Sequence, residues 1–360
     1  MQEKLYWLGF SLFPGIGPKK FRQLLEAFGS AENAWNASES SFEAIAKPAL
    51  AQKFFVFKKN FSLDSYVKNL EAKNIWFVTL ADNDYPELLR QSANPPFVLF
   101  GKGNPDLFLL QNTLGVVGTR KITTYGRQVT EMVTRELVEA NFCIISGLAM
   151  GVDAIAHQTA LENKGKTIAV LGCGVDLCFP KENEKIYERI LSEGSLIVSE
   201  YPPGSQPTKG SFPSRNRIIA GLSKAIVVTE GAEDSGALIT AEDCFVNKRS
   251  VFAIPGPITS SLSKGPNKLL KKGAVLVTSG DDILSSLGEA SPMIKHTLFK
   301  SDVPDEQTII TLLAHEELTF DELVKRISFD PSRLNIILSV MEIKKILRKS
   351  DQGKYHLLGY

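Results

Sequence analysis

Short apolar runs recur through the middle of the chain, and each of them stops at a glycine-containing turn. The clearest three are Leu114–Gly118, Phe142–Ser146 and Thr167–Leu171. Between them, apolar positions repeat with a helical period over residues 125–140 and 152–161. A strand, a glycine turn and a helix that repeat about every thirty residues are typical of βαβ units, so the pattern predicts a parallel sheet.

Six further runs extend this pattern and raise the predicted number of strands to nine. They lie at residues 75–80, 97–100, 195–199, 225–229, 250–254 and 274–278. Continuous apolar runs are typical of strands that are buried on both faces. The predicted fold class is therefore α/β, a doubly wound and mostly parallel sheet with helices on both faces, over residues 76–287.

Helical periodicity dominates the first 75 residues, which we predict to form a separate module. The turn Gly15-Ile16-Gly17-Pro18, followed by two lysines, separates the first two helices. It resembles the turn of helix-hairpin-helix modules, in which backbone N–H groups and nearby cations hold a DNA phosphate. A plain turn between two helices explains the same residues equally well.

The C-terminal part of the chain is predicted to be a second small module. Residues 288–304 lack periodicity and contain two prolines, so they are interpreted as a linker. Within 305–360, helices are predicted at 321–327 and 332–345, and a hairpin at 346–348 and 354–358. Helix, turn, helix and hairpin in this order indicate a winged helix.

Composition excludes several classes of function. The formal net charge is +1, so any polyanion must be held by a local patch rather than by the field of the whole protein. The four cysteines are scattered, and neither a metal site nor a disulfide framework is predicted. No apolar run approaches about 18 residues, so no membrane span is expected. These features indicate a cytoplasmic protein with reduced thiols.

The distribution of charge along the chain is more informative than its sum. Residues 107–130, 201–229 and 244–280 contain no acidic residue, and each window spans the carboxyl end of a predicted strand. Their cations are Arg120, Lys121, Arg127, Lys209, Arg215, Arg217, Lys224, Lys248, Arg249, Lys264, Lys268, Lys271 and Lys272. This predicts one positive edge that would suit a polyanion. Solvated lysine-rich loops are the alternative.

Two groups of residues could contact nucleic acid at that edge. Arg120 follows the first glycine turn, where a guanidinium and a helix N-terminus would converge on one phosphate. Because the turn lacks the G-x-G-x-x-G and Walker spacings, no nucleotide cofactor is predicted. Phe212-Pro-Ser-Arg215-Asn216-Arg217, together with Phe179 and Lys181, interleaves aromatic and cationic side chains, as single strands require. Aromatic residues that seal the core are the alternative.

Catalysis is a weaker hypothesis. Asp153 and His157 lie one helical turn apart, and Glu200 and Glu230 follow strands. However, Asp153 occupies the place of a first-turn acid, and His157 on an alanine-rich helix is more typical of a core histidine. No arrangement of nucleophile, base and orienting group is evident in the spacing.

Seven motifs together point to a known family. They include Gly-Val-Val-Gly-Thr-Arg at 115–120, Phe-Pro-Lys-Glu-Asn at 179–183 and Phe-Pro-Ser-Arg-Asn-Arg at 212–217, and the others lie at 146–157, 171–176, 199–204 and 235–241. The set resembles the bacterial DNA-processing proteins called DprA or Smf, densely over residues 84–280. Phe179 stands where the family more usually has tyrosine.

The resemblance implies an extended Rossmann fold that forms a homodimer, flanked by a helix-hairpin-helix or SAM-like module and a winged helix. It also implies that the protein is not an enzyme, and that it binds single-stranded DNA and loads the recombinase RecA during natural transformation, with single-strand-binding protein as a further partner. The candidate DNA-binding residues are Gly118, Thr119, Arg120, Ser146, Gly147, Gly174, Phe179, Lys181, Phe212, Arg215, Asn216 and Arg217.

The alternative from another class is an enzyme. Nucleotide phosphoribohydrolases that look like lysine decarboxylases share the extended Rossmann fold and carry Pro-Gly-Gly-x-Gly-Thr-x-x-Glu. The nearest stretch here, Ser235–Glu242, has other spacing and fewer glycines. This departure counts against hydrolysis.

Overall fold

The computed structural model describes residues 2–289, 301, 303–313, 316–327, 329–344, 346–350 and 353–357. The chain divides into two compact units, Met1–Ala290 and Ser291–Tyr360. The predicted linker at 288–304 lies mostly outside the described residues. No helix in the described part of the chain is both long and apolar enough to cross a lipid bilayer.

Six helices open the first unit and pack around an aromatic core. They are α1 (Gln2–Leu12), α2 (Pro18–Phe28), α3 (Ala31–Asn36), α4 (Glu39–Ala46), α5 (Pro48–Asn60) and α6 (Leu63–Ala72). Phe10, Phe42 and Phe54 are fully buried within the bundle. Phe21 of α2 stacks on Phe97 beside the sheet, with 4.3 Å between ring centroids. The core of these helices is therefore continuous with that of the sheet.

The predicted turn between α1 and α2 is present. Gly15 has φ 111°, a conformation that favours glycine, and Pro18 is the first residue of α2. Lys20 Nζ donates to the Gly15 carbonyl oxygen over 3.3 Å. That this turn holds a DNA phosphate, as in helix-hairpin-helix modules, stays a prediction.

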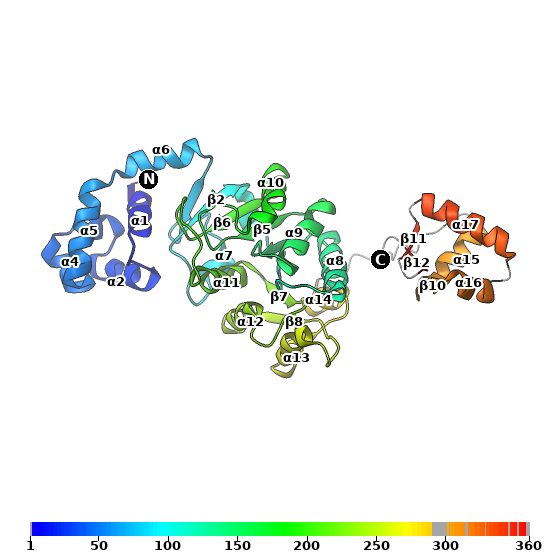
Figure 1. Cartoon of the computed structure of the whole chain (residues 1–360). Helices are drawn as coiled ribbons and strands as arrows, with labels where there is room; N and C mark the ends of the chain where they lie inside the picture. Colours follow the sequence, from blue (N-terminus) through cyan, green and yellow to red (C-terminus); the bar gives the residue numbers. More distant parts are fainter. Residues whose placement is uncertain are drawn as a thin grey trace. The chain divides into compact units, whose positions relative to one another are not determined.

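A nine-stranded sheet forms the centre of the first unit (Figure 1). Its strands lie where the apolar runs predict them: β1 (Trp76–Thr79), β2 (Val98–Gly103), β3 (Thr113–Val117), β4 (Cys143–Ser146), β5 (Thr167–Val170), β6 (Leu196–Ser199), β7 (Ala225–Val228), β8 (Ser250–Ala253) and β9 (Val275–Leu276). The order is β1-β2-β6-β5-β4-β3-β7-β8-β9. From β6 to β9 all pairs are parallel, whereas β2 runs antiparallel to both of its neighbours.

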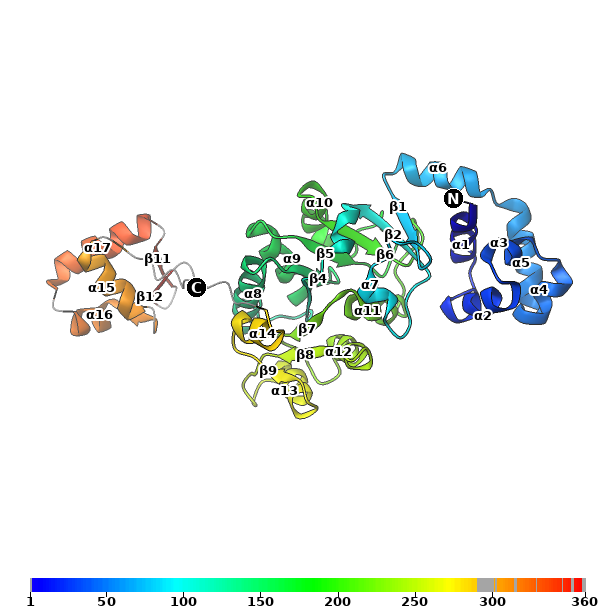
Figure 2. The same ribbon diagram turned by 180° about the vertical axis from the view of Figure 1, so that it is seen from behind.

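Helices cover both faces of the sheet, as the doubly wound prediction requires (Figures 1 and 2). Alternation along β3 shows why, since Leu114 and Val116 enter one core and Val117 enters the other. One face carries α8 (Thr124–Glu139), α9 (Val152–Glu162), α10 (Glu184–Ser192) and α14 (Gly280–Ser286). The other carries α7 (Glu87–Arg90), α11 (Ser211–Leu222), α12 (Gly236–Val246) and α13 (Lys264–Lys271). Three 3-10 turns complete the unit: η1 (Pro105–Leu109), η2 (Lys181–Asn183) and η3 (Ser261–Ser263).

The second unit has its own small core. It contains α15 (Pro304–Leu313), α16 (Phe320–Arg326), α17 (Pro331–Ile343), β10 (Leu318–Thr319), β11 (Leu347–Lys349) and β12 (Lys354–Leu357). The strands form an antiparallel sheet in the order β10-β12-β11. Helices α16 and α17 and the hairpin lie where the sequence predicts them, whereas α15 and β10 were not predicted. The predicted ends at Lys345 and Leu358 lie outside the described residues.

Candidate functional site

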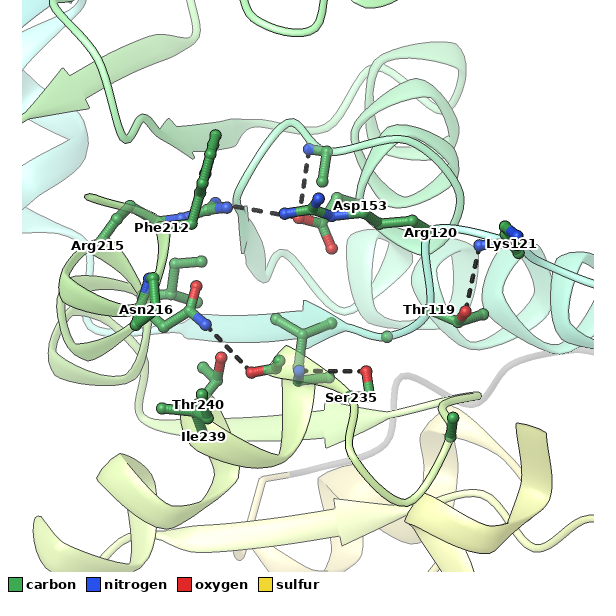
Figure 3. Close-up of a pocket in the computed structure, with 18 of the residues that line it drawn as sticks. Thr119, Arg120, Lys121, Asp153, Phe212, Arg215, Asn216, Ser235, Ile239 and Thr240 are labelled. Atoms are coloured by element: carbon green, nitrogen blue, oxygen red, sulfur yellow. Dashed lines mark hydrogen bonds and ion pairs between the residues drawn. The ribbon is translucent and has the colours of Figure 1, made fainter. Parts of the chain in front are cut away.

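The order of the strands creates a crevice between β3 and β7. The chain leaves β3 towards β4, β5 and β6 on one side, and returns to β7 on the other side. In doubly wound folds, ligands bind at such a switch point, beyond the carboxyl ends of the strands. A cavity of about 590 Å³ lies at that point, lined by residues 117–121 after β3 and by the first turns of α11 and α12 (Figure 3).

An exposed cation and one aromatic ring line this cavity, and a second aromatic ring lies beside them. The Arg120 guanidinium carbon lies 5.3 Å from the centroid of the Phe212 ring, within cation–π range. The ring of Phe179, which is 45% exposed, lies 5.7 Å from that of Phe212. Arg120 is in no ion pair with a residue that the structure describes. The sequence-predicted residues Arg120, Phe179 and Phe212 are therefore brought together.

Lys181 also lies near these aromatic rings but not in the same cavity. It is exposed and lines a neighbouring hollow together with Phe179, Met150 and Gln206. A flexible polymer that passes over Phe179 would contact both the cavity and this hollow.

The turn after β3 is fixed by hydrogen bonds rather than open for an anion. The Thr119 N–H donates to the Glu230 carbonyl oxygen over 2.7 Å, and the Thr119 carbonyl oxygen accepts from Val152 over 3.1 Å. A β-carbon on Gly118 would lie 2.5 Å from a methyl carbon of Val152, so only glycine allows this close approach. Gly118 and Thr119 shape the cavity wall.

The expectation that Arg120 sits at a free helix N-terminus is wrong. Helix α8 begins four residues later, at Thr124, and is capped by the Thr123 side chain. The buried carboxylate of Glu230 accepts from the Thr123 N–H at 2.9 Å and from its hydroxyl at 2.7 Å. These bonds hold the N-cap residue and place a carboxyl group beside the helix end. The exposed cationic group at this wall is therefore the Arg120 side chain and not a free helix end.

Arg215 is a buried cation that holds the floor of the cavity. Its Nη1 donates to the Val170 carbonyl oxygen over 3.0 Å and lies 4.0 Å from Asp153 Oδ2. A β-carbon on Gly147 would lie only 1.2 Å from this Nη1, so Gly147 provides the space for the guanidinium. Burial lowers the pKa of Arg215, and Asp153 opposes that shift. Arg215 thus lines the cavity without being exposed.

Asp153 completes this buried pair. Its carboxylate accepts from the Gly147 N–H at 3.2 Å and from the Ala149 N–H at 3.3 Å. Burial raises the pKa of Asp153, while Arg215 and these N–H groups act in the opposite direction. Asp153 lies in the first turn of α9, as predicted.

The Arg-Asn-Arg segment at 215–217 is helical. It lies in α11, where successive side chains point about 100° apart and cannot all enter one cavity. Asn216 lines the main cavity and donates to the Gly236 carbonyl oxygen over 3.1 Å. Arg217 faces a different cavity of about 580 Å³, beside Tyr201, and is paired with Glu200.

Two more predicted site residues are structural. The buried Ser146 hydroxyl donates to the Val116 carbonyl oxygen over 2.7 Å and joins β4 to β3. Gly174 is buried, and its N–H donates to the Ser205 carbonyl oxygen over 2.9 Å. Neither lines the cavity at the switch point.

The sequence pointed to some cavity residues only through the charge windows. Lys121 and Lys209 line the cavity and are exposed. Both lysines lie in acid-free windows, but nothing in the sequence distinguished them from the other lysines of these windows. Thr240 and the exposed Ile239 of α12 also line the cavity; they lie in the family motif at 235–241 but were not singled out as site residues.

The prediction of one positive edge is only partly right. Lys224 and Arg249 come directly before strands, so they lie at the opposite edge of the sheet. Arg249 donates to backbone carbonyl oxygens of Ala220, Gly221, Ser223 and Leu88, and so binds elements together. Lys224 is ion-paired with Glu289, and two further cations of the windows are also ion-paired, Lys268 with Glu233 and Lys272 with Glu242.

The candidate acid–base groups have structural partners. His157 Nδ1 lies 2.6 Å from the Thr167 hydroxyl, and burial lowers the pKa of this imidazole to about 3. The core-histidine interpretation is confirmed. Within the described part of the chain, no three His, Cys, Asp or Glu side chains are grouped closely enough to hold a metal ion.

These features define a doubly wound α/β protein with a cationic and aromatic cavity at its switch point. Residues 76–288 match the family model described as DNA recombination-mediator protein A. Protein Smf of Synechocystis sp. is 38% identical over 312 residues, which cover 85% of this chain and 78% of that protein. DNA processing protein DprA of Streptococcus pneumoniae is 42% identical over 228 residues, 63% of this chain and 80% of that protein.

Solved structures agree. The X-ray structure of DprA from Streptococcus pneumoniae aligns with a TM-score of 0.68 at 36% identity and covers 79% of this chain and 97% of that one. DprA from Helicobacter pylori, described for its single-stranded DNA binding mode, aligns with a TM-score of 0.53 at 31% identity, over 59% of this chain and 95% of that one. The chain belongs to the DNA recombination-mediator protein A family, whose members are DNA-processing proteins.

Proposed function

We propose that this protein binds single-stranded DNA in the cavity between β3 and β7. The observation that carries the proposal is the exposed Arg120 guanidinium over the Phe212 ring, with Phe179 beside it. A cation that follows the phosphates next to rings that stack on bases is the combination that single strands require. The relative from Helicobacter pylori, described for single-stranded DNA binding, supports it.

We assign the roles of the site residues from the exposure of their side chains. Arg120, Phe179, Lys181 and Phe212 are proposed to contact DNA directly. Gly118, Thr119, Ser146, Gly147 and Gly174 are proposed to shape the site, and Arg215 to hold its floor. Asn216 lines the cavity and offers an amide, whereas Arg217 is proposed to act mainly through its pair with Glu200.

A direct comparison of ligands tests this proposal. Fluorescence anisotropy with one labelled oligonucleotide, free and annealed to its complement, should show tighter binding of the single strand. Splayed bases can reach Phe179 and Phe212, whereas bases stacked in a duplex cannot. Equal or tighter binding of the duplex would contradict the proposal.

The cellular role that we propose is the loading of RecA onto single-stranded DNA during natural transformation, in the cytoplasm, by a homodimer. Single-strand-binding protein is proposed as a further partner. The test is the DNA-dependent ATPase activity of RecA on DNA coated with single-strand-binding protein. This chain should shorten the lag, and a variant that does not bind DNA should not.

The terminal modules are proposed to be a helix-hairpin-helix or SAM-like module and a winged helix. In the winged-helix candidate, Arg333 is ion-paired with Asp305 and Lys344 with Glu306, so much of the basic charge of its third helix is neutralised. Because the carboxylate of Glu306 is buried, a DNA phosphate cannot easily replace it at Lys344, and this argues against duplex DNA as the ligand of the module. A protein that contains only residues 1–290 should therefore bind single-stranded DNA as tightly as the full chain does.

We propose that no hydrolysis accompanies binding. Glu230 accepts from Thr123, the N-cap residue of α8, and Glu242 is ion-paired with Lys272 on the surface, so we propose neither as a general base. Nucleotide turnover that is lost in Glu230→Gln or Glu242→Gln would contradict this.

A further inference from the structure

A second groove adjoins the cavity at the switch point. It has a volume of about 660 Å³ and is lined by the turn after β3, the start of α8, and one side each of α9 and α10. Five of its lining side chains are cationic, and Glu182 is the single anionic one among the lining residues, all of which the structure describes. The cations are Arg120, Lys121, Arg127, Lys185 and Arg189.

The groove and the cavity share one wall. Arg120 and Lys121 line both of them. In Figure 3, Arg120 lies between Phe212 and Lys121. Gly151 allows α9 to approach this wall closely, since it has φ 76° and its β-carbon would lie 2.3 Å from the Thr119 carbonyl oxygen. The wall therefore presents cations to both hollows.

The cations of the groove are available to an external anion. Lys121 and Lys185 are exposed, and neither is ion-paired with a residue that the structure describes. Arg127 pairs with Glu131 over 3.3 Å and Arg189 with Glu193 over 2.7 Å, each with a residue four positions further along the chain and open to solvent. Exposed pairs of this kind contribute little to stability, so a phosphate can replace the carboxylate.

The groove differs from the cavity in its lining, and this difference indicates the kind of ligand that it would bind. No aromatic residue is among its lining residues, whereas Phe212 lines the cavity. A row of cations without stacking rings fits a sugar–phosphate backbone whose bases face solvent. Cations from three elements suit an extended polyanion better than a single small anion.

We propose that a single DNA strand leaves the cavity over Arg120 and that its phosphates continue along Lys121, Lys185 and Arg189. This inference rests on the proposed function, because it extends the same site. The groove thus lengthens the site without adding preference for any base. It makes affinity depend on the length of the strand.

The test uses two variants with equal charge changes. Lys185→Gln with Arg189→Gln alters the groove, and Lys164→Gln with Lys248→Gln is the control, since both of these exposed lysines precede strands at the opposite edge. Anisotropy is measured with oligothymidylates of about five and about twenty nucleotides, over a salt series.

The groove variant should bind the long oligonucleotide roughly tenfold more weakly, with a salt slope that is smaller in magnitude by about 1.4, because two phosphate contacts are lost. Its affinity for the short one, and both affinities of the control, should equal those of the wild type. An unchanged long-strand affinity, or equal losses for both lengths, would overturn the inference; in the first case an acidic protein segment becomes the candidate ligand. If the wild type binds neither oligonucleotide, the proposed function itself fails.

Discussion

Arg120 lies over the ring of Phe212, although Arg120 precedes a helix on one face of the sheet and Phe212 belongs to a helix on the other face. Arg120 follows β3, and Phe212 is the second residue of α11. The contact holds a flexible cation in one place before any ligand arrives, which reduces the entropy lost on binding. It also places a phosphate-binding group beside a base-stacking surface.

Removal of the ring should therefore weaken DNA binding. We expect Phe212→Ala to lose about 1–3 kcal/mol of single-strand affinity, or roughly 5- to 150-fold, because a base loses its stacking partner. Phe212→Tyr keeps the ring and should bind like the wild type. Wild-type affinity in Phe212→Ala, measured by anisotropy, would contradict the assigned role.

A methyl group at Gly147 should disrupt the floor of the cavity. It would collide with Nη1 of Arg215, which cannot move away without leaving Asp153 and Val170. We expect Gly147→Ala to lose about 1–3 kcal/mol of stability from overpacking, and DNA affinity with it. Gly210→Ala is the matched control, since nothing lies within 4 Å of its β-carbon. Equal melting temperatures of the two variants would refute this account of Gly147.

Stability should fall in mild acid because of His157. Burial, followed by Arg215, lowers its pKa from 6.5 to about 3. The unfolded chain takes up this proton near pH 6.5 and the folded chain does not, so the free energy of unfolding falls below that pH. The loss approaches about 1.4 kcal/mol per pH unit down to about pH 3.

Urea unfolding at about pH 7.5 and about pH 5 measures this effect, which should reach about 2 kcal/mol. His157→Gln cannot take up the proton, so its stability should depend less on pH than that of the wild type. An identical pH dependence in both proteins would show that other groups are responsible.

Arg217 should matter more for stability than for DNA. The pair with Glu200 is largely buried, with 16% and 15% of the side chains exposed. Burial raises the pKa of Glu200 and Arg217 opposes this, so removal of the cation leaves a poorly compensated carboxylate. Arg217→Gln should lose about 3 kcal/mol of stability. Most of it should return in the double variant with Glu200→Gln; a larger loss of DNA affinity than in Phe212→Ala would argue for direct contact.

The sequence predicted the fold closely because periodicity reports burial. All nine strands lie at their apolar runs, and β3 follows the simple alternation of two buried faces. The direction of β2 could not be predicted, since an apolar run reads the same in parallel and antiparallel pairs.

The site was predictable in part for a related reason. Spacing placed Arg120 and the aromatic rings at one edge, because residues after parallel strands meet there. It could not show that Arg215 turns inward while Arg217 faces another cavity, because the rotation of α11 about its axis is set by packing. Charge counts along the chain likewise cannot show that Lys209 follows a strand whereas Arg249 precedes one, which places the two cations at opposite edges of the sheet.

The most direct test of the central claim is single-strand affinity of Arg120→Glu over a salt series. Lys164→Glu, which changes an exposed cation at the opposite edge, is the control. We expect a loss of more than about 100-fold in Arg120→Glu, wild-type affinity in the control, and wild-type binding that weakens steeply with salt. If Arg120→Glu binds single strands as tightly as the wild type, the cavity between β3 and β7 is not the DNA site.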